Sequence, residues 1–174
     1  GSVVDSLLDL HLVPLAISYE YDPCDFLKAQ EFQLKRDIPG WKKSAQDDIV
    51  SMQTGIMGYK GHIHYHAAPC IDAWLRELPA DTPKADIFRI IAEHIDREIH
   101  AHYQLFPSNF VALDMLQGND AHADKYSAAD KAQFEKYIAG QLAKIQIENK
   151  DEAYLRECIL KMYANPAINQ LALA

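Results

Sequence analysis

The sequence predicts a helix-rich α/β fold, with a partial sheet near residues 12–20 and 61–67 and a C-terminal helical lobe. The front third holds one short apolar run and one stretch in which apolar and polar residues alternate, and both patterns are typical of strands. From Ala80 onward the apolar residues recur at helical spacing instead. The 174 residues suffice for one hydrophobic core. We therefore expect a single compact unit, in which residues 1–78 form the α/β part and residues 79–174 pack on it as a helical extension.

The first element is the apolar run at residues 12–20, which its branched side chains and the turn after it mark as a buried strand. An acidic turn then leads into a helix. Asp22 suits the N-cap, where its carboxylate can accept from a free backbone amide. Pro23 suits the first helical position, which needs no amide donor, and the negative charge of Asp25 suits the first turn because it complements the helix dipole. We expect this helix to end near Arg36, since a proline and a glycine follow.

A second helix is predicted at residues 42–53, and a glycine-rich turn then leads to the alternating strand near residues 61–67. In the C-terminal lobe, a proline at position 83 starts a helix that carries a stripe of isoleucines. A short helix follows, which contains Phe110.

Two long helices complete the lobe. Ser127 and Asp130 resemble the capping pair of the first. Asp151 opens the last helix, and we expect Pro166 to end it.

Composition excludes several classes of function. The net charge of -8 argues against a nucleic-acid partner, which favours a basic face. No apolar run approaches the roughly 20 residues that span a bilayer, so we expect no transmembrane segment. The three cysteines are scattered, without the paired spacing of a zinc or redox motif. Reduced thiols of this kind suit a cytoplasmic protein, with peripheral contact at the inner membrane as a further expectation.

Two groups of charged residues are candidate binding sites. Glu20 follows the first strand, at the strand end where ligands bind in α/β sheets. A local excess of basic residues around a tryptophan suits a phosphate group or an anionic membrane, and the alternative is an ordinary solvated surface. This basic patch consists of Lys28, Lys35, Arg36, Lys42 and Lys43 around Trp41.

His62, His64 and His66 alternate along the second predicted strand and would share one of its faces. Imidazoles on one face can bind a first-row metal ion. The simpler alternative is a half-exposed strand face on which histidine fills amphipathic positions. A metal-binding protein is accordingly the weaker of the alternatives kept open.

Several blocks of the sequence resemble the bacterial branch of a known enzyme family, the glycerolipid acyltransferases of the 1-acylglycerol-3-phosphate acyltransferase type. Residues 13–17 (VPLAI) resemble the valine-proline block of that family, and residues 61–71 resemble its later glycine-led strand. Residues 18–25 and the region around Lys35 are similar to the bacterial branch. The likeness spans about residues 3–115, and it implies that the strand of Pro14 backs an acyl or phosphate site.

The catalytic motifs of that family are missing. Its general base is a histidine followed five positions later by an aspartate, and none of the eight histidines here has that partner. The family's phosphate-binding block begins with a Glu-Gly pair, which does not occur in this chain. The resemblance therefore implies a C-terminal part of an acyltransferase, inactive alone and without a catalytic residue, cofactor or metal of its own.

The parent enzyme would use acyl-CoA or an acyl carrier protein thioester as donor and a glycerophosphate-type hydroxyl as acceptor. The expected partners are the missing N-terminal catalytic part, the membrane surface and a second copy of the chain. The alternative from another class is a non-catalytic helical interaction module.

Overall fold

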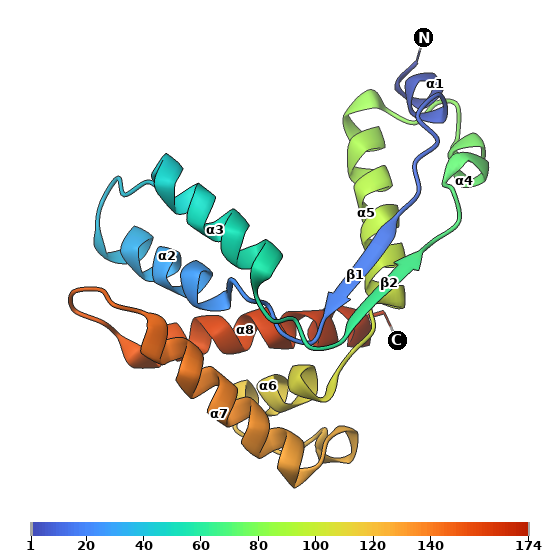
Figure 1. Cartoon of the computed structure of the whole chain (residues 1–174). Helices are drawn as coiled ribbons and strands as arrows, with labels where there is room; N and C mark the ends of the chain where they lie inside the picture. The colour runs from blue at the N-terminus through green and yellow to red at the C-terminus, as the bar shows by residue number, and fades with distance from the viewer. Residues whose placement is uncertain (1, 174) are drawn as a thin grey trace. The chain divides into compact units, whose positions relative to one another are not determined.

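The computed structural model describes residues 2–173, so that Gly1 and Ala174 lie outside the description (Figure 1). The described residues form eight α-helices, one short 3-10 helix and a two-stranded antiparallel sheet. The predicted helix-rich α/β class is thus confirmed. The chain divides into two compact units that alternate along the sequence. The predicted boundary near residue 78 stays a prediction.

Of the described residues, the first unit comprises 2–18, 64–104 and 169–173. It contains most of the sheet and three helices: α1 (Val3–Leu8), α4 (Asp72–Arg76) and α5 (Lys84–His102). The predicted isoleucine stripe of α5 is confirmed, since Ile87 and Ile91 are buried. They form a small core with residues 71 and 75 of the α4 region, against which side chains of α1 pack.

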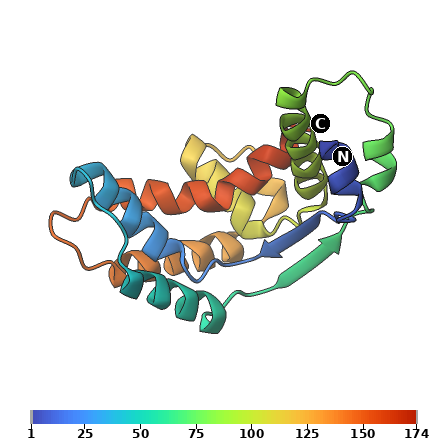
Figure 2. The same cartoon turned by 90° about the horizontal axis from the view of Figure 1, so that it is seen from above.

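Strands β1 (Leu15–Tyr19) and β2 (Ile63–Ala67) run side by side in opposite directions (Figures 1 and 2). Both are shorter than predicted. The amide of Ala68 donates to the carbonyl of Pro14 at 2.9 Å, and this register places Ile17 opposite Tyr65. One face of β1 is buried through Ala16 and Ser18, whereas Ile17 and Tyr65 are exposed on the other face. The sheet therefore has an apolar face that the described residues leave open to solvent.

The second unit comprises residues 19–63 and 105–168. Its elements are α2 (Asp25–Asp37), α3 (Ala45–Met57), α6 (Pro107–Gln117), the 3-10 helix η1 (Ala123–Lys125), α7 (Ala128–Lys144) and most of α8 (Glu152–Leu171). Helix α7 packs against α2 and α6. The core is centred on α7 and α8, where Phe134, Ile138, Leu155 and Ile159 are almost completely buried.

Local hydrogen bonds explain where two of these helices begin. The predicted cap of α7 is confirmed, because the Ser127 hydroxyl accepts from the amide of Asp130 at 3.1 Å. Ser44 and Asp47 make the same capping box at the start of α3. Helix α3 consequently begins three residues after the predicted Lys42, and it also continues past the predicted end.

Two expectations about helix ends were wrong. Asp22 is not the N-cap of α2, since its carboxylate accepts from the amide of Cys24 at 2.9 Å and closes a turn before the helix. The helix begins at Asp25. Pro166 does not end α8, which continues to Leu171. A proline removes one backbone hydrogen bond, and the burial of Tyr163 and Ala167 on either side holds the helix together.

Within residues 2–173, no helix combines the length and the apolar character that crossing a membrane requires.

Candidate functional site

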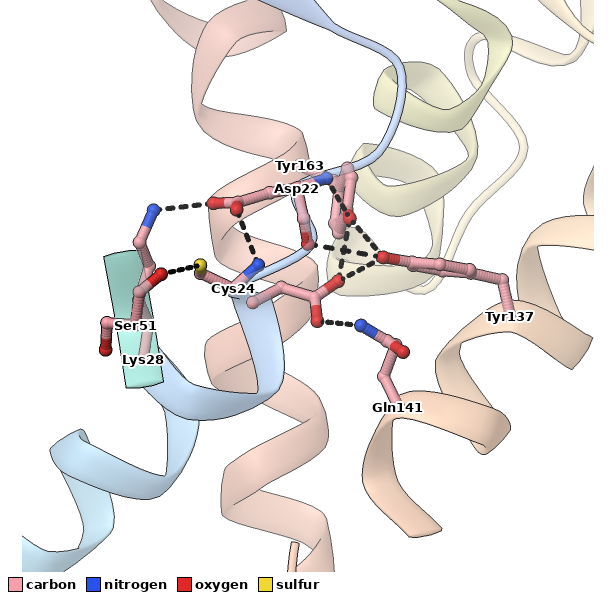
Figure 3. A network of polar contacts seen from close by, with 8 residues as sticks. Asp22, Cys24, Lys28, Ser51, Tyr137, Gln141 and Tyr163 are labelled. Carbon is pink, nitrogen blue, oxygen red and sulfur yellow. Dashed lines mark hydrogen bonds and ion pairs between the residues drawn. The ribbon is translucent and has the colours of Figure 1, made fainter. Parts of the chain in front are cut away.

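A buried aspartate at the start of α2 is the centre of a polar network in the second unit. The Asp25 carboxylate accepts hydrogen bonds from the hydroxyls of Tyr137 and Tyr163, each 2.7 Å from Oδ2. Gln141 donates from Nε2 to the other oxygen, Oδ1. Figure 3 shows Tyr137 of α7 and Tyr163 of α8 with their hydroxyls converging. These donors compensate a fully buried carboxylate that would otherwise be costly to remove from water.

The network shifts the pKa values of its members. Burial raises the pKa of Asp25, and the hydrogen bonds from Tyr137, Tyr163 and Gln141 oppose this rise without cancelling it. Burial, followed by the negative charge of Asp25, raises the pKa of both tyrosines far above the ordinary value. Both phenols therefore remain protonated donors at neutral pH.

The same network holds the turn before α2 in place. The Tyr163 hydroxyl accepts from the amide of Asp22 at 2.9 Å, and Lys28 donates to the Asp22 carboxylate at 2.5 Å. The Cys24 thiol donates to the carbonyl of Ser51 in α3 at 3.3 Å (Figure 3). Burial raises the pKa of this thiol, so Cys24 contributes to structure rather than to nucleophilic chemistry.

Two adjoining surface cavities border this network, with volumes of about 390 and 330 Å³. They share Tyr59, Tyr137, Gln141 and Lys144. Tyr21 and Lys136 also line the larger one. We refer to the pair as the tyrosine cavity.

Aromatic rings form the walls of the tyrosine cavity. The Tyr21 ring lies 4.4 Å from the Tyr137 ring and stacks on Tyr59 at 5.9 Å, measured between ring centroids. Lys144 donates to the Gln141 side chain at 2.5 Å, and Lys136 is exposed at the rim. Flat apolar walls beside two cations suit a ligand that combines a planar or apolar part with an anionic group.

Glu20, the predicted strand-end candidate, does not line the tyrosine cavity. Its Oε2 accepts from the amide of His62 at 2.9 Å and lies 2.7 Å from Nδ1 of the same residue. Gly61 precedes this contact with a φ of 64°. Glu20 thus closes the turn before β2, and a role in ligand binding stays a prediction.

The residues of the basic patch are largely paired with acidic neighbours. Lys35 and Lys43 both contact the Glu31 carboxylate, at 2.6 and 3.7 Å. Arg36 binds Asp37 and Asp151 and lies over the Tyr154 ring. These contacts offset most of the expected positive charge.

Two further members of the basic patch differ in their surroundings. Trp41 is half-buried beside Lys43, in a small cavity of about 40 Å³, whereas Lys42 is exposed. Binding of phosphate or membrane by the patch stays a prediction.

Pro14 and the three alternating histidines have separate surroundings. Pro14 is buried, and its carbonyl pairs with β2. His64 and His66 lie on β2 in the first unit, where His66 stacks on His102 of α5 at 4.1 Å. His62 lies in the second unit, bound to Glu20. A metal site formed by the histidines stays a prediction.

Sequence reasoning missed the residues that surround Asp25. Tyr137 and Gln141 are four positions apart and hence share a face of α7, next to the buried residues Ile138 and Leu142. Polar residues at the border of an apolar stripe are the signal that the sequence offers. It does not indicate the partner, because Asp25 lies 112 residues before Tyr137.

Comparisons of this chain with models of known protein families, with curated proteins and with solved structures gave no match.

Proposed function

We propose that this chain is the carboxy-terminal part of a bacterial glycerolipid acyltransferase of the 1-acylglycerol-3-phosphate acyltransferase type. In this proposal it binds substrate, and the transfer itself takes place on the missing N-terminal part. The reaction moves an acyl chain from a thioester to a glycerophosphate hydroxyl. Support comes from the sequence resemblance over about residues 3–115 and from the tyrosine cavity.

The tyrosine cavity is the observation that carries the substrate-binding role. Coenzyme A, the carrier of the acyl donor, has a planar adenine ring and several phosphate groups. The exposed ring of Tyr59, which stacks on the buried Tyr21, offers a flat face to such a ring, and Lys136 and Lys144 offer positive charge to phosphate. We assign the cavity to the nucleotide part of the donor.

A cytoplasmic place, with peripheral contact at the inner membrane, belongs to the same proposal. The thiols of Cys24, Cys70 and Cys158 are all unpaired, which supports a reducing compartment. The catalytic base is assigned to the N-terminal part because no histidine of this chain has an aspartate five positions later.

The DNA that precedes the codon for Gly1 tests the assignment to this family. We expect it to encode a histidine followed five positions later by an aspartate, within about 100–200 codons, the length of one domain. If the upstream reading frame lacks this motif, the acyltransferase assignment is wrong. A purified chain that transfers acyl groups from acyl-CoA to lysophosphatidate would contradict the non-catalytic role.

Titration calorimetry with coenzyme A tests the cavity. We expect the double substitution Lys136→Gln, Lys144→Gln to weaken binding at least about tenfold, because each lost charge-assisted contact is worth roughly 1.5–3 kcal/mol when buried and less at a rim. Lys131→Gln is the matched control, since Lys131 lies on α7 but pairs with Asp120. Equal affinities of the double variant and the control would disprove this use of the cavity.

The exposed face of α3 favours a second candidate, a helical module that binds a protein partner. Ile56 and Met57 are 73% and 80% exposed, and Ile49 and Met52 lie on the same helix with more than half of their surface open. Missing upstream motifs together with no coenzyme A binding would favour this candidate over the acyltransferase.

A further inference from the structure

Three side chains with metal-binding atoms meet in the first unit. His11 lies in the loop between α1 and β1, Cys70 in the loop after β2, and Asp72 at the first position of α4. The imidazole nitrogen, the thiol sulfur and a carboxylate oxygen of these residues all lie within 4.8 Å of one another. They offer one nitrogen, one sulfur and one oxygen, which are the three ligand types that zinc accepts in proteins.

Backbone pairing brings the two loops together. The amide of Ile71 donates to the carbonyl of Leu12 at 3.0 Å. Leu12 follows His11, and Ile71 lies between Cys70 and Asp72, so this hydrogen bond holds the two loops together at the three side chains. His11 itself has a φ of 49°, in the left-handed region that non-glycine residues rarely occupy. The surrounding contacts hold this conformation although it costs about 1 kcal/mol or more. The imidazole is thus positioned by the fold.

The carboxylate of Asp72 has an unused oxygen. Its Oδ2 lies 2.6 Å from Nδ1 of His11, whereas Oδ1 is buried and has no hydrogen-bond partner. A buried acceptor without a donor costs free energy, and a bound cation would satisfy it. The His11 side chain is 71% exposed, so an ion can reach the group from solvent.

We propose that His11, Cys70 and Asp72 bind one zinc ion, with water as the fourth ligand. In a tetrahedral zinc site, bonds of about 2.0–2.3 Å place the ligand atoms about 3.3–3.8 Å apart. The three ligand atoms therefore need to move by roughly 1 Å. The hydrogen bond between His11 and Asp72 opens, because zinc takes the place of the proton that the two side chains share. The carboxylate and the thiolate formed on binding balance the charge of the ion. Arg76 adds one positive charge near Asp72, which the two anionic ligands outweigh.

Zinc competition with a chromophoric chelator tests the site in the purified chain, kept reduced by a phosphine. We expect one zinc ion per chain. Cys70→Ser and Asp72→Asn should each weaken binding by more than about tenfold, because each removes a ligand atom. His11→Asn should do the same, and asparagine tolerates the left-handed backbone.

Two substitutions serve as matched controls. His122→Asn removes an imidazole whose Nδ1 also contacts a carboxylate, at 2.7 Å from Asp114. Cys158→Ser removes a thiol of the second unit. Neither should change the zinc affinity. If the controls weaken binding as much as Cys70→Ser does, the assigned ligands are wrong.

Cobalt substitution gives a readout that needs no variant. A thiolate ligand produces a sulfur-to-cobalt charge-transfer band in the near ultraviolet, and tetrahedral coordination produces intense visible bands. Circular dichroism establishes whether each variant is folded. No zinc binding by the native sequence at submillimolar concentration, or a cobalt spectrum without the charge-transfer band, would overturn the proposal.

Discussion

Asp25 and Asp114 are both almost completely buried in the second unit, but their surroundings shift their pKa values in opposite directions. The pKa of Asp25 is raised, because burial outweighs its hydrogen bonds. Burial also acts to raise the pKa of Asp114, but hydrogen bonds from His122 and Tyr126 outweigh it, so this pKa is lowered. Burial and the hydrogen bond to Asp114 raise the pKa of Tyr126 to about 12. Asp25 has no fewer donors than Asp114, so the deeper burial of Asp25 among protein atoms, rather than the number of donors, accounts for the opposite directions.

Asp25→Asn should destabilise the protein by roughly 1–3 kcal/mol, since the amide presents a donor where three donors converge. In the native protein, the raised pKa gives a stability contribution that is complete below the ordinary value of 3.8 and is lost as the pH rises through the raised value. The difference in the free energy of unfolding between the native protein and Asp25→Asn should therefore shrink from about pH 4 to pH 7. Urea denaturation across this range measures it, and a difference that widens with pH would contradict the raised pKa.

Asp114→Asn should show the opposite trend. The lowered pKa stabilises the fold above the ordinary value of 3.8, and this contribution is lost as the pH falls through the folded-state pKa. We expect the cost of Asp114→Asn, roughly 1–3 kcal/mol at pH 5, to decrease as the pH is lowered to about 3. The same urea measurements supply the comparison. A cost that rises toward acid pH would show that Asp114 is not held ionised by its donors.

At the scale of elements, two turns use a glycine with nearly the same φ in different surroundings. Gly61 has a φ of 64°, and a Cβ built there would lie 2.5 Å from Oε2 of Glu20 and 2.8 Å from the Tyr21 ring. Gly118, the C-cap of α6, has a φ of 65° and open space around it. At position 61, both the positive φ and the close contacts require glycine. At position 118, only the positive φ requires it.

This comparison predicts unequal costs for the same substitution. Gly118→Ala should destabilise by about 1 kcal/mol, the usual penalty of a left-handed alanine. Gly61→Ala should cost at least about 2–3 kcal/mol, since the methyl group must also displace Glu20 from the turn. Urea denaturation of the two variants tests it. Equal costs would mean that the Glu20–His62 turn adapts freely.

Elements were predictable from the sequence where local interactions decide them. The capping pair Ser127 and Asp130 and the isoleucine stripe of α5 both rest on neighbours within a few residues, and both are confirmed. The end of α8 was misjudged because tertiary packing around Pro166 outweighs the local preference. The short helices α1 and α4 were not predicted. They pack on each other, although the capping box of Ser2 and Asp5 is a local signal for the start of α1.

The candidate site was less accessible to sequence reasoning than the fold. The acidic turn at residues 20–25 was identified, but Asp25 was interpreted as a helix-starting residue. Its partners Tyr137 and Tyr163 lie 112 and 138 residues later, so that only the tertiary structure unites them. The same holds for His11 and Asp72, which are 61 residues apart and carry no motif.

At the scale of the whole molecule, the sheet leaves an apolar face and its strand edges uncovered in the part of the chain that the structure describes. Each strand has one neighbour in that part, so each also has an edge without a partner strand. The face formed by Leu15, Ile17 and Tyr65 is 41–59% exposed. Open strand edges next to an apolar face are typical sites of strand pairing between chains.

We therefore expect the isolated chain to dimerise through this sheet, with a second copy covering Ile17 and Tyr65. Sedimentation velocity over a range of protein concentrations measures the association. The double substitution Ile17→Lys, Tyr65→Lys should shift the chain toward monomer, because burying two lysines in an apolar interface is costly. Ile49→Lys on the exposed face of α3 is the matched control and should leave the association unchanged. Dissociation by the control alone would assign the contact to α3, and a strictly monomeric native chain would contradict the dimer.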